Sequence, residues 1–246
     1  MSSLHDCFVQ APHQIRRVTV LGSSVSMLVR TSGEGKAFPR LLEELLNERS
    51  EQLWIVENLS RIAGVVSDAN EYLSHLVANP PDVIILHYGH VEAVPRRQPR
   101  SVWLRTYLYK PGESKRRRQL NVVGHKYSGA RRRVGYWVQW LPPDEFRRRM
   151  SELIGYLQRE TGARILVLEA NPGDERLESL APGVRAAMVR YNGILTTLAV
   201  ELGVELVELS EVAGGRPVVE LTPDGTHFDA KAHGAVAEAL ARRILA

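Results

Sequence analysis

Short apolar runs alternate with longer segments of helical periodicity along most of this chain. The apolar runs occupy residues 17–21, 53–57, 82–86, 164–168 and 204–209. Between and after them, apolar residues recur at helical spacing in 38–48, 68–78, 144–160, 184–202 and 230–245. Strand, helix, strand order requires a parallel sheet with helices on both faces. We therefore expect an α/β fold: a flavodoxin-like three-layer α/β/α sandwich with a parallel five-stranded sheet.

This fold also predicts where a functional site lies. In open parallel sheets, ligands bind in the crevice beyond the carboxyl ends of the strands. Ser24 follows the first predicted strand, Ser67 follows the second, and the segment HYGHVE (87–92) follows the third. We expect these three segments to meet at one edge of the sheet.

The bulk composition is that of a water-soluble globular protein, with 246 residues, 44% of them hydrophobic and 24% charged. We interpret residues 1–246 as a single domain. No apolar run is long enough for a signal peptide or a membrane-spanning helix, so we expect a cytoplasmic protein. Cys7 is the only cysteine, which rules out an internal disulfide, and we assign it no function.

One segment interrupts the alternation and carries most of the positive charge. Residues 96–133 contain 13 Lys or Arg against one acid, Glu113, a balance of 13 − 1 = +12, whereas the remainder has 19 − 27 = −8. The wider interval 93–142 also holds seven of the sixteen aromatic residues: Trp103, Tyr107, Tyr109, Tyr127, Tyr136, Trp137 and Trp140. We interpret it as a basic flap over the active edge that favours an anionic partner. Nucleic acid ranks last among such partners, because no nucleic-acid-binding fold signature accompanies the flap.

Three residues have the chemistry of a serine nucleophile system. Acyl transfer by serine needs an imidazole within hydrogen-bond reach, a carboxylate on the other ring nitrogen, and donors for the developing oxyanion. In the sequence DGTH, Asp224 is placed to bind one nitrogen of His227 and leave the other free to face Ser24. A serine after a strand and an Asp-Gly pair are each common in turns and caps, so the combination matters more than its parts.

Together these segments resemble the SGNH (GDSL-like) hydrolase family along nearly the whole chain. VLGSSVS (20–26), AGVVSDA (63–69), PDVIILHYGHVE (81–92) and DGTHFDAKAHG (224–234) are similar to its four sequence blocks. The resemblance implies the SGNH hydrolase fold, with Ser24 as nucleophile, His227 as general base and acid, and Asp224 as the orienting carboxylate. The chain departs from the family pattern at Ser23, usually aspartate, at Ser67, usually the oxyanion-hole glycine, and at Val91, usually asparagine.

Several further assignments follow from this comparison. The backbone N–H groups of Ser24, Ser67 and Gly89 are the predicted oxyanion hole. Loss of the asparagine donor typically raises the activation barrier by about 3 to 4 kcal/mol. His90 and Arg96 are the candidate replacements for this donor. The predicted substrate-binding residues are His90, Arg96 and Arg97. A metal site at His87 and His90 lacks a clear third ligand, so we predict neither metal nor other cofactor.

The favoured function is a serine ester hydrolase that forms an acyl-enzyme with a small-molecule or glycan ester, for which both an anionic and a carrier-bound substrate stay open. Two alternatives stay open. An acyltransferase would use the same triad and differ only in how well the site excludes water. A non-catalytic anion-binding protein would retain the scaffold and use only the basic flap.

Overall fold

The computed structural model describes residues 15–28, 35–98 and 136–246 of the chain. Its centre is a five-stranded sheet in which every pairing is parallel, with the strand order β2-β1-β3-β6-β7. These strands are β1 (Ile15–Gly22), β2 (Leu53–Asn58), β3 (Val83–His87), β6 (Arg164–Leu168) and β7 (Glu205–Val207). Strand β3 lies at the centre of the sheet and is buried along its whole length, as expected for a strand covered on both faces.

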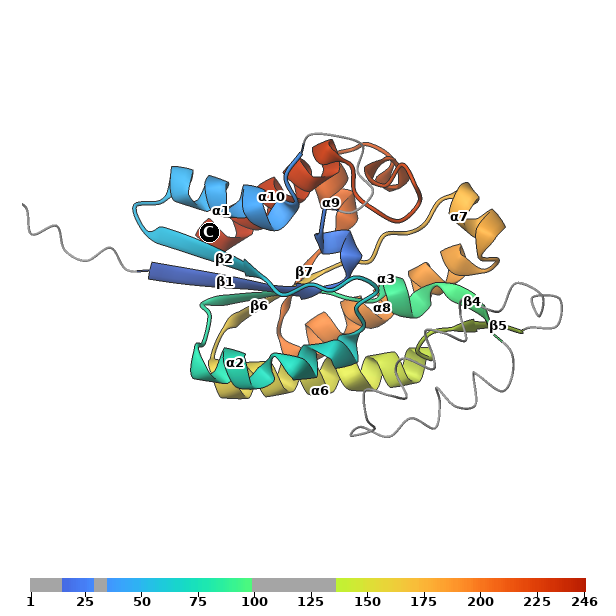
Figure 1. Cartoon of the computed structure of the whole chain (residues 1–246), viewed down its shortest axis with the longest axis horizontal. Helices are drawn as coiled ribbons and strands as arrows, with labels where there is room; N and C mark the ends of the chain where they lie inside the picture. Colours follow the sequence, from blue (N-terminus) through green and yellow to red (C-terminus); the bar gives the residue numbers. More distant parts are fainter. Residues whose placement is uncertain (1–14, 29–34, 99–135) are drawn as a thin grey trace, which may run out of the picture.

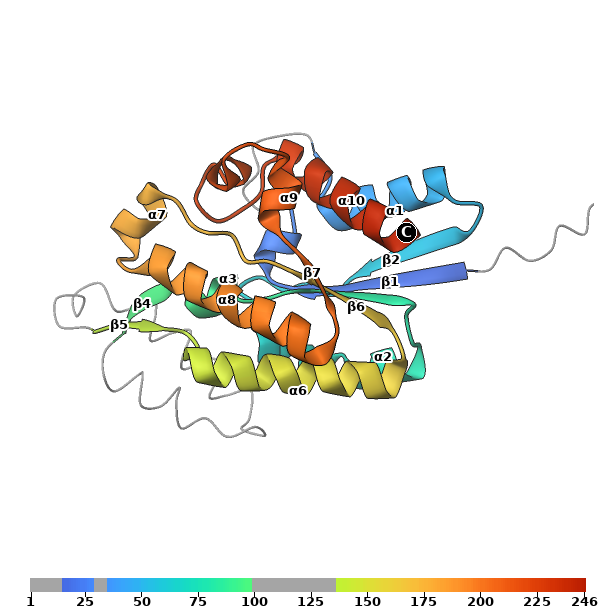
Figure 2. The same ribbon diagram turned by 180° about the vertical axis from the view of Figure 1, so that it is seen from behind.

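Helices cover both faces of this sheet and complete a three-layer architecture (Figures 1 and 2). One face carries α1 (Phe38–Arg49), α9 (Leu209–Ala213) and α10 (Ala230–Leu245), and the other carries α2 (Leu73–Ala78), α6 (Pro143–Thr161) and α8 (Val184–Leu202). Each face has its own apolar core, built around Phe38 and Leu240 on the first and around Phe146 and Tyr191 on the second. Each such side chain contributes about 1.5–3 kcal/mol by burial. The predicted α/β/α sandwich is confirmed.

One predicted helix, 68–78, is wrong in its first half. Residues Val66–Glu71 form a 3-10 helix, η2, and the α-helix begins only at Leu73. The reason is a set of competing hydrogen bonds. The Asp68 carboxylate accepts from the backbone N–H of Val65 at 3.0 Å, and the Glu92 carboxylate accepts from that of Val66 at 2.7 Å. These tertiary bonds hold a tight turn that periodicity does not reveal.

The remaining elements are short and lie mainly at the carboxyl edge of the sheet. They are the 3-10 helices η1 (Ser24–Ser26) and η3 (Val218–Leu221), the helices α3 (His90–Ala93) and α7 (Glu175–Leu180), and an antiparallel pair, β4 (Pro95–Gln98) with β5 (Tyr136–Gln139). This pair lies beyond the end of the main sheet (Figure 1) and forms the two ends of the predicted flap.

Parts of the chain for which we made predictions lie outside the described residues. These are Cys7, residues 99–135 of the flap, and the side chain of Arg97. Among the helices that are described, none combines the length and apolarity needed to cross a bilayer.

Candidate active site

Ser24 lies on the turn that directly follows β1. The Ser23 hydroxyl caps this turn by accepting from the backbone N–H of Val25 at 3.4 Å. Gly22 permits the close approach of β3, because a Cβ there would lie 2.9 Å from the His87 carbonyl oxygen and 2.8 Å from Ser26 Oγ. The first N–H of a helical turn has no acceptor within the turn. The backbone therefore presents both the hydroxyl and the N–H of Ser24 at the carboxyl edge of the sheet.

His227 and Asp224 lie on the loop that precedes α10. Asp224 Oδ1 accepts the backbone N–H groups of Thr226 at 2.9 Å and His227 at 2.6 Å, while Oδ2 is 2.8 Å from His227 Nδ1. Burial opposes ionisation of this carboxyl. The hydrogen bonds from the backbone and ring of His227 and the backbone of Thr226 outweigh burial and hold the Asp224 pKa below its usual range. The carboxylate thus stays charged and fixes the imidazole.

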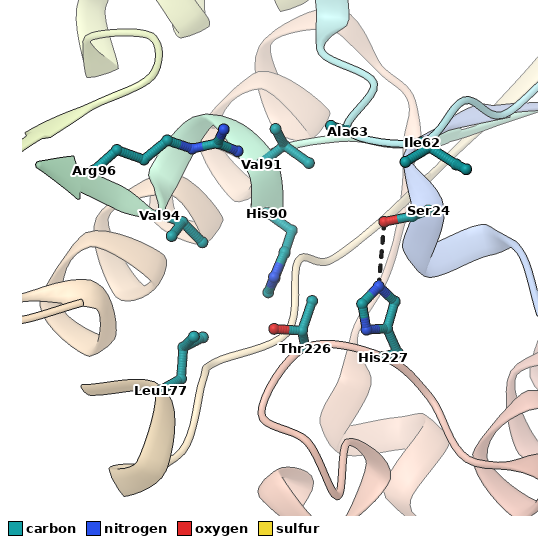
Figure 3. A pocket seen from close by; sticks show the side chains of 10 residues that line it. All are labelled: Ser24, Ile62, Ala63, His90, Val91, Val94, Arg96, Leu177, Thr226 and His227. Carbon is teal, nitrogen blue, oxygen red and sulfur yellow. Dashed lines mark hydrogen bonds between the residues drawn. The ribbon is translucent and has the colours of Figure 1, made fainter. Parts of the chain in front are cut away.

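The other imidazole nitrogen faces the serine. Ser24 Oγ is 3.2 Å from His227 Nε2, although the two residues are 203 positions apart in the sequence (Figure 3). With the Nδ1 proton donated to Asp224, Nε2 is the acceptor for the serine hydroxyl. The structure therefore brings Ser24, His227 and Asp224 into one hydrogen-bonded chain.

This chain opens into a pocket of about 240 Å³. The pocket is bounded by the loops after β1, β2 and β3 and by the loop before α10 (Figure 3). Its lining residues are Ser24, Ile62, Ala63, His90, Val91, Val94, Arg96, Leu177, Thr226 and His227. Half of these residues are apolar and half are polar, and polar groups that converge between apolar walls are typical of a small-molecule site.

His90 is the most unusual polar group of this pocket. Its side chain is only 4% exposed and extends into the pocket toward the loop that carries Thr226 (Figure 3). Neither ring nitrogen has a hydrogen-bond partner in the described part of the chain. Burial, reinforced by the nearby His227 and Arg96, lowers the pKa of His90 to about 4 despite the opposing charge of Asp224. The ring is therefore neutral at pH 7.

Arg96 enters the pocket from β4, on the side away from Ser24 (Figure 3). Its guanidinium stacks on the Trp140 ring, with 4.5 Å between the guanidinium carbon and the ring centroid. Burial lowers the pKa of Arg96, and the charge of Glu92 partly opposes that shift. No acidic side chain among the described residues forms an ion pair with it. Of the predicted substrate-binding residues, His90 and Arg96 reach the pocket.

Glu92, for which we predicted no role, connects three segments around the pocket. Its buried carboxylate accepts the backbone N–H of Val66 at 2.7 Å and that of Gly89 at 3.0 Å. Its carbonyl oxygen accepts the N–H of Trp140 at 3.0 Å. Burial raises the pKa of Glu92 to about 7. Because the Gly89 N–H already has this partner, the structure does not support Gly89 as an oxyanion donor.

The predicted donor Ser67 also differs from what the structure places at the site. Ser67 lies within η2 and does not line the pocket, whereas Ala63, four residues earlier, does. Ala63 has a positive φ of 53°, in the left-handed region that residues with a Cβ rarely adopt. The resemblance to the family's sequence blocks indicated Ser67 as the residue of this loop at the site. A position soon after the end of β2 is the signal that would have indicated Ala63.

A second serine–histidine pair lies below the pocket. Ser26 Oγ is 2.8 Å from His87 Nδ1, and the His87 ring stacks on Phe228 with centroids 5.8 Å apart. Burial, with smaller contributions from His90 and His233, lowers the pKa of His87 to about 3. Both members are buried in the core. No group of three or more His, Cys, Asp or Glu within residues 15–28, 35–98 and 136–246 is arranged to hold a metal ion.

Comparison with known proteins gives agreement in structure rather than in sequence. No family model matches the chain, and no curated protein sequence matches it. Among solved structures it is similar to a lipase/acylhydrolase from Enterococcus faecalis, with 12% identity, a TM-score of 0.62, and coverage of 93% of this chain and 95% of the other. It is also similar to an acetylxylan esterase from Geobacillus stearothermophilus, with 17% identity, a TM-score of 0.60, and coverage of 93% of this chain and 94% of the other. A third similar structure is a GDSL-like lipase from Parabacteroides merdae, with 13% identity, a TM-score of 0.61, and coverage of 92% of this chain and 94% of the other. The chain therefore has the fold of the SGNH (GDSL-like) hydrolases.

Proposed function

We propose that the protein is a serine ester hydrolase that acts through an acyl-enzyme. The observation that carries this proposal is the hydrogen-bonded chain from Ser24 through His227 to Asp224, with distances of 3.2 and 2.8 Å, at the wall of a pocket. Nucleophile, base and orienting carboxylate are the three groups that acyl transfer by serine requires. The fold supports the proposal, since solved structures with the same fold include esterases and lipases.

In the proposed reaction, His227 Nε2 takes the hydroxyl proton as Ser24 Oγ bonds to the ester carbonyl carbon. The carbonyl π electrons move to oxygen, giving a tetrahedral oxyanion. Collapse of this intermediate breaks the bond to the alcohol oxygen, which receives the proton from His227. Water then repeats the sequence on the acyl-enzyme and releases the acid and free Ser24. These steps use only side chains and water, so no cofactor enters the proposal.

Backbone donors for the oxyanion come from neighbouring loops. We assign this role to the N–H of Ser24 and, in place of Ser67 and Gly89, to the N–H of Ala63. Strands β1 and β2 are adjacent in the sheet, and Ser24 and Ala63, on the loops that follow them, both line the pocket. Such preorganised donors act where negative charge develops.

Pocket size and charge bear on the substrate. A volume of about 240 Å³ is below the usual range for drug-sized ligands, which favours a short acyl group on a small-molecule or glycan ester. The Arg96 guanidinium, without an acidic partner among the described residues, favours a substrate that carries a negative charge on the side away from Ser24. An acetylated glycan would agree with the name of one structural neighbour, an acetylxylan esterase.

A panel of 4-nitrophenyl esters tests the proposal. We expect the wild-type chain to hydrolyse the acetyl and butyryl esters with a higher kcat/KM than the octanoyl ester, and Ser24→Ala to lose at least 1,000-fold of that activity. Ser60→Ala, at a half-buried serine on the loop after β2 that does not line the pocket, serves as the matched control. Hydrolysis that survives in Ser24→Ala would refute the assignment. Release of nitrophenol that requires an added alcohol would instead identify an acyltransferase.

A further inference from the structure

One buried polar side chain of the pocket makes no hydrogen bond to any described residue. His90 is 4% exposed, and both of its ring nitrogens lack a partner in the described part of the chain. A buried donor or acceptor without a partner destabilises the folded state by its desolvation, and each such group in a native structure calls for an explanation. Such groups concentrate where function requires them. Since no described residue binds this imidazole, a ligand in the pocket is a group that could supply its hydrogen bond.

The sheet order places this imidazole beside the proposed reacting centre. Strands β2, β1 and β3 are neighbours in that order, so the loops after them bring Ala63, Ser24 and His90 to one side of the pocket. All three residues line it (Figure 3). His90 is also close enough to His227 and Asp224 to be affected by their charges. An ester carbonyl bound to Ser24 thus has His90 within its surroundings.

We propose that His90 donates a ring N–H to the carbonyl oxygen of the ester and stabilises the oxyanion that forms when Ser24 attacks. This inference rests on the proposed hydrolase function. His90 would be the third donor of the oxyanion hole, beside the N–H groups of Ser24 and Ala63. In this role it is a catalytic residue, since it touches the reacting oxygen.

Other uses of His90 fit the structure less well. As a general base it would compete with His227, which already has both an orienting carboxylate and the serine hydroxyl. A neutral imidazole is a good donor but a weak anion receptor, so the charged part of a substrate belongs with Arg96. Arg96 in turn stacks on Trp140 at the far side of the pocket and is poorly placed for the oxyanion.

Steady-state kinetics on 4-nitrophenyl acetate with the full chain tests the proposal. We expect His90→Ala to lower kcat by about 100- to 1,000-fold, the usual effect of removing one oxyanion donor, with KM changed less than threefold. His90→Gln and His90→Asn place an amide N–H near Nε2 and Nδ1 respectively. We expect one of them to keep kcat within about tenfold of wild type. His75→Ala removes an exposed histidine paired with Glu57 at 3.1 Å and should leave kcat unchanged.

Thermal unfolding separates this role from a structural one. Because His90 has no hydrogen-bond partner among the described residues and its ring lines the pocket, we expect His90→Ala to keep a Tm close to that of the wild type while its kcat falls. An unchanged kcat, a defect confined to KM, or an equal fall in kcat for the Ala, Asn and Gln variants would overturn the inference and leave the hydrolase intact. Absence of any Ser24-dependent turnover in the wild type would overturn both.

Discussion

Asp224→Asn replaces one carboxylate oxygen by an NH₂ group, and the consequence can be worked out from the loop geometry. Oδ1 of Asp224 accepts two backbone N–H groups, from Thr226 and His227, at 2.9 and 2.6 Å. In the variant, this position must remain an oxygen, because an amide NH₂ would face two donors. The NH₂ group is therefore forced to the Oδ2 position, 2.8 Å from His227 Nδ1.

This orientation reverses the tautomer of His227. Facing an N–H donor, Nδ1 must become the acceptor, so the ring proton moves to Nε2. Nε2 can then no longer accept the proton of Ser24, 3.2 Å away. The same tautomer reversal in a serine protease lowers kcat by about 10⁴, and we expect a loss of about 10³- to 10⁴-fold here, equivalent to roughly 4–5.5 kcal/mol in the barrier.

Initial rates with a short-chain nitrophenyl ester measure this effect, with thermal unfolding as a check on folding. Asp82→Asn is the matched control, because Asp82 lies at the amino end of β3 and accepts the backbone N–H of Arg17, far from the pocket. We expect that control to keep wild-type kcat. A fall in kcat of less than tenfold for Asp224→Asn, in a variant with a normal Tm, would refute the reasoning.

Three further predictions follow. Arg96→Ala should raise KM about tenfold or more for 4-nitrophenyl hemisuccinate but less than twofold for the uncharged butyrate, since a charge-assisted hydrogen bond is worth about 1.5–3 kcal/mol; equal effects on the two esters would exclude anion binding. Glu92 has a pKa of about 7 in the folded state, above its usual 4.5. The folded state therefore holds this proton more tightly than the unfolded state, so the contribution of Glu92 to the free energy of unfolding is full below about pH 4.5 and is lost as pH rises through 7. Urea unfolding at pH 5 and 8 should show this decline, and Glu92→Gln should reduce it. Gly225→Ala adds a Cβ at φ +78°, 3.0 Å from Leu177 Cβ, and should lower Tm by about 2–4 °C for each kcal/mol of strain; an unchanged Tm would show that the loop adapts.

The sheet and its helices could be predicted because apolar periodicity reports burial directly. Residues 164–168, 184–202 and 230–245 match β6, α8 and α10 residue for residue. The approach of Ser24 to His227 could also be anticipated, since parallel strands end at one edge and a loop residue reaches that edge from far along the chain.

Which backbone N–H groups are free to serve as oxyanion donors could not be predicted from the sequence, because their availability depends on tertiary contacts. The Gly89 N–H is taken by the Glu92 carboxylate, and nothing in the sequence HYGHVE shows that this acid folds inward. Likewise, the positive φ of Ala63 is a property of the folded loop, and alanine gives no sign of it. The Glu92 carboxylate also accepts the Val66 N–H, and this tertiary bond favours the 3-10 turn that replaces the first half of the predicted helix 68–78.

Active-site labelling tests the central claim most directly. We expect a fluorophosphonate to add once to the wild-type chain, with the mass increase mapped by peptide sequencing to Ser24 and not to the buried Ser26. Ser24→Ala should acquire no adduct, and Asp224→Asn should react far more slowly than wild type. An unlabelled wild-type protein, or an adduct that persists in Ser24→Ala, would contradict the account.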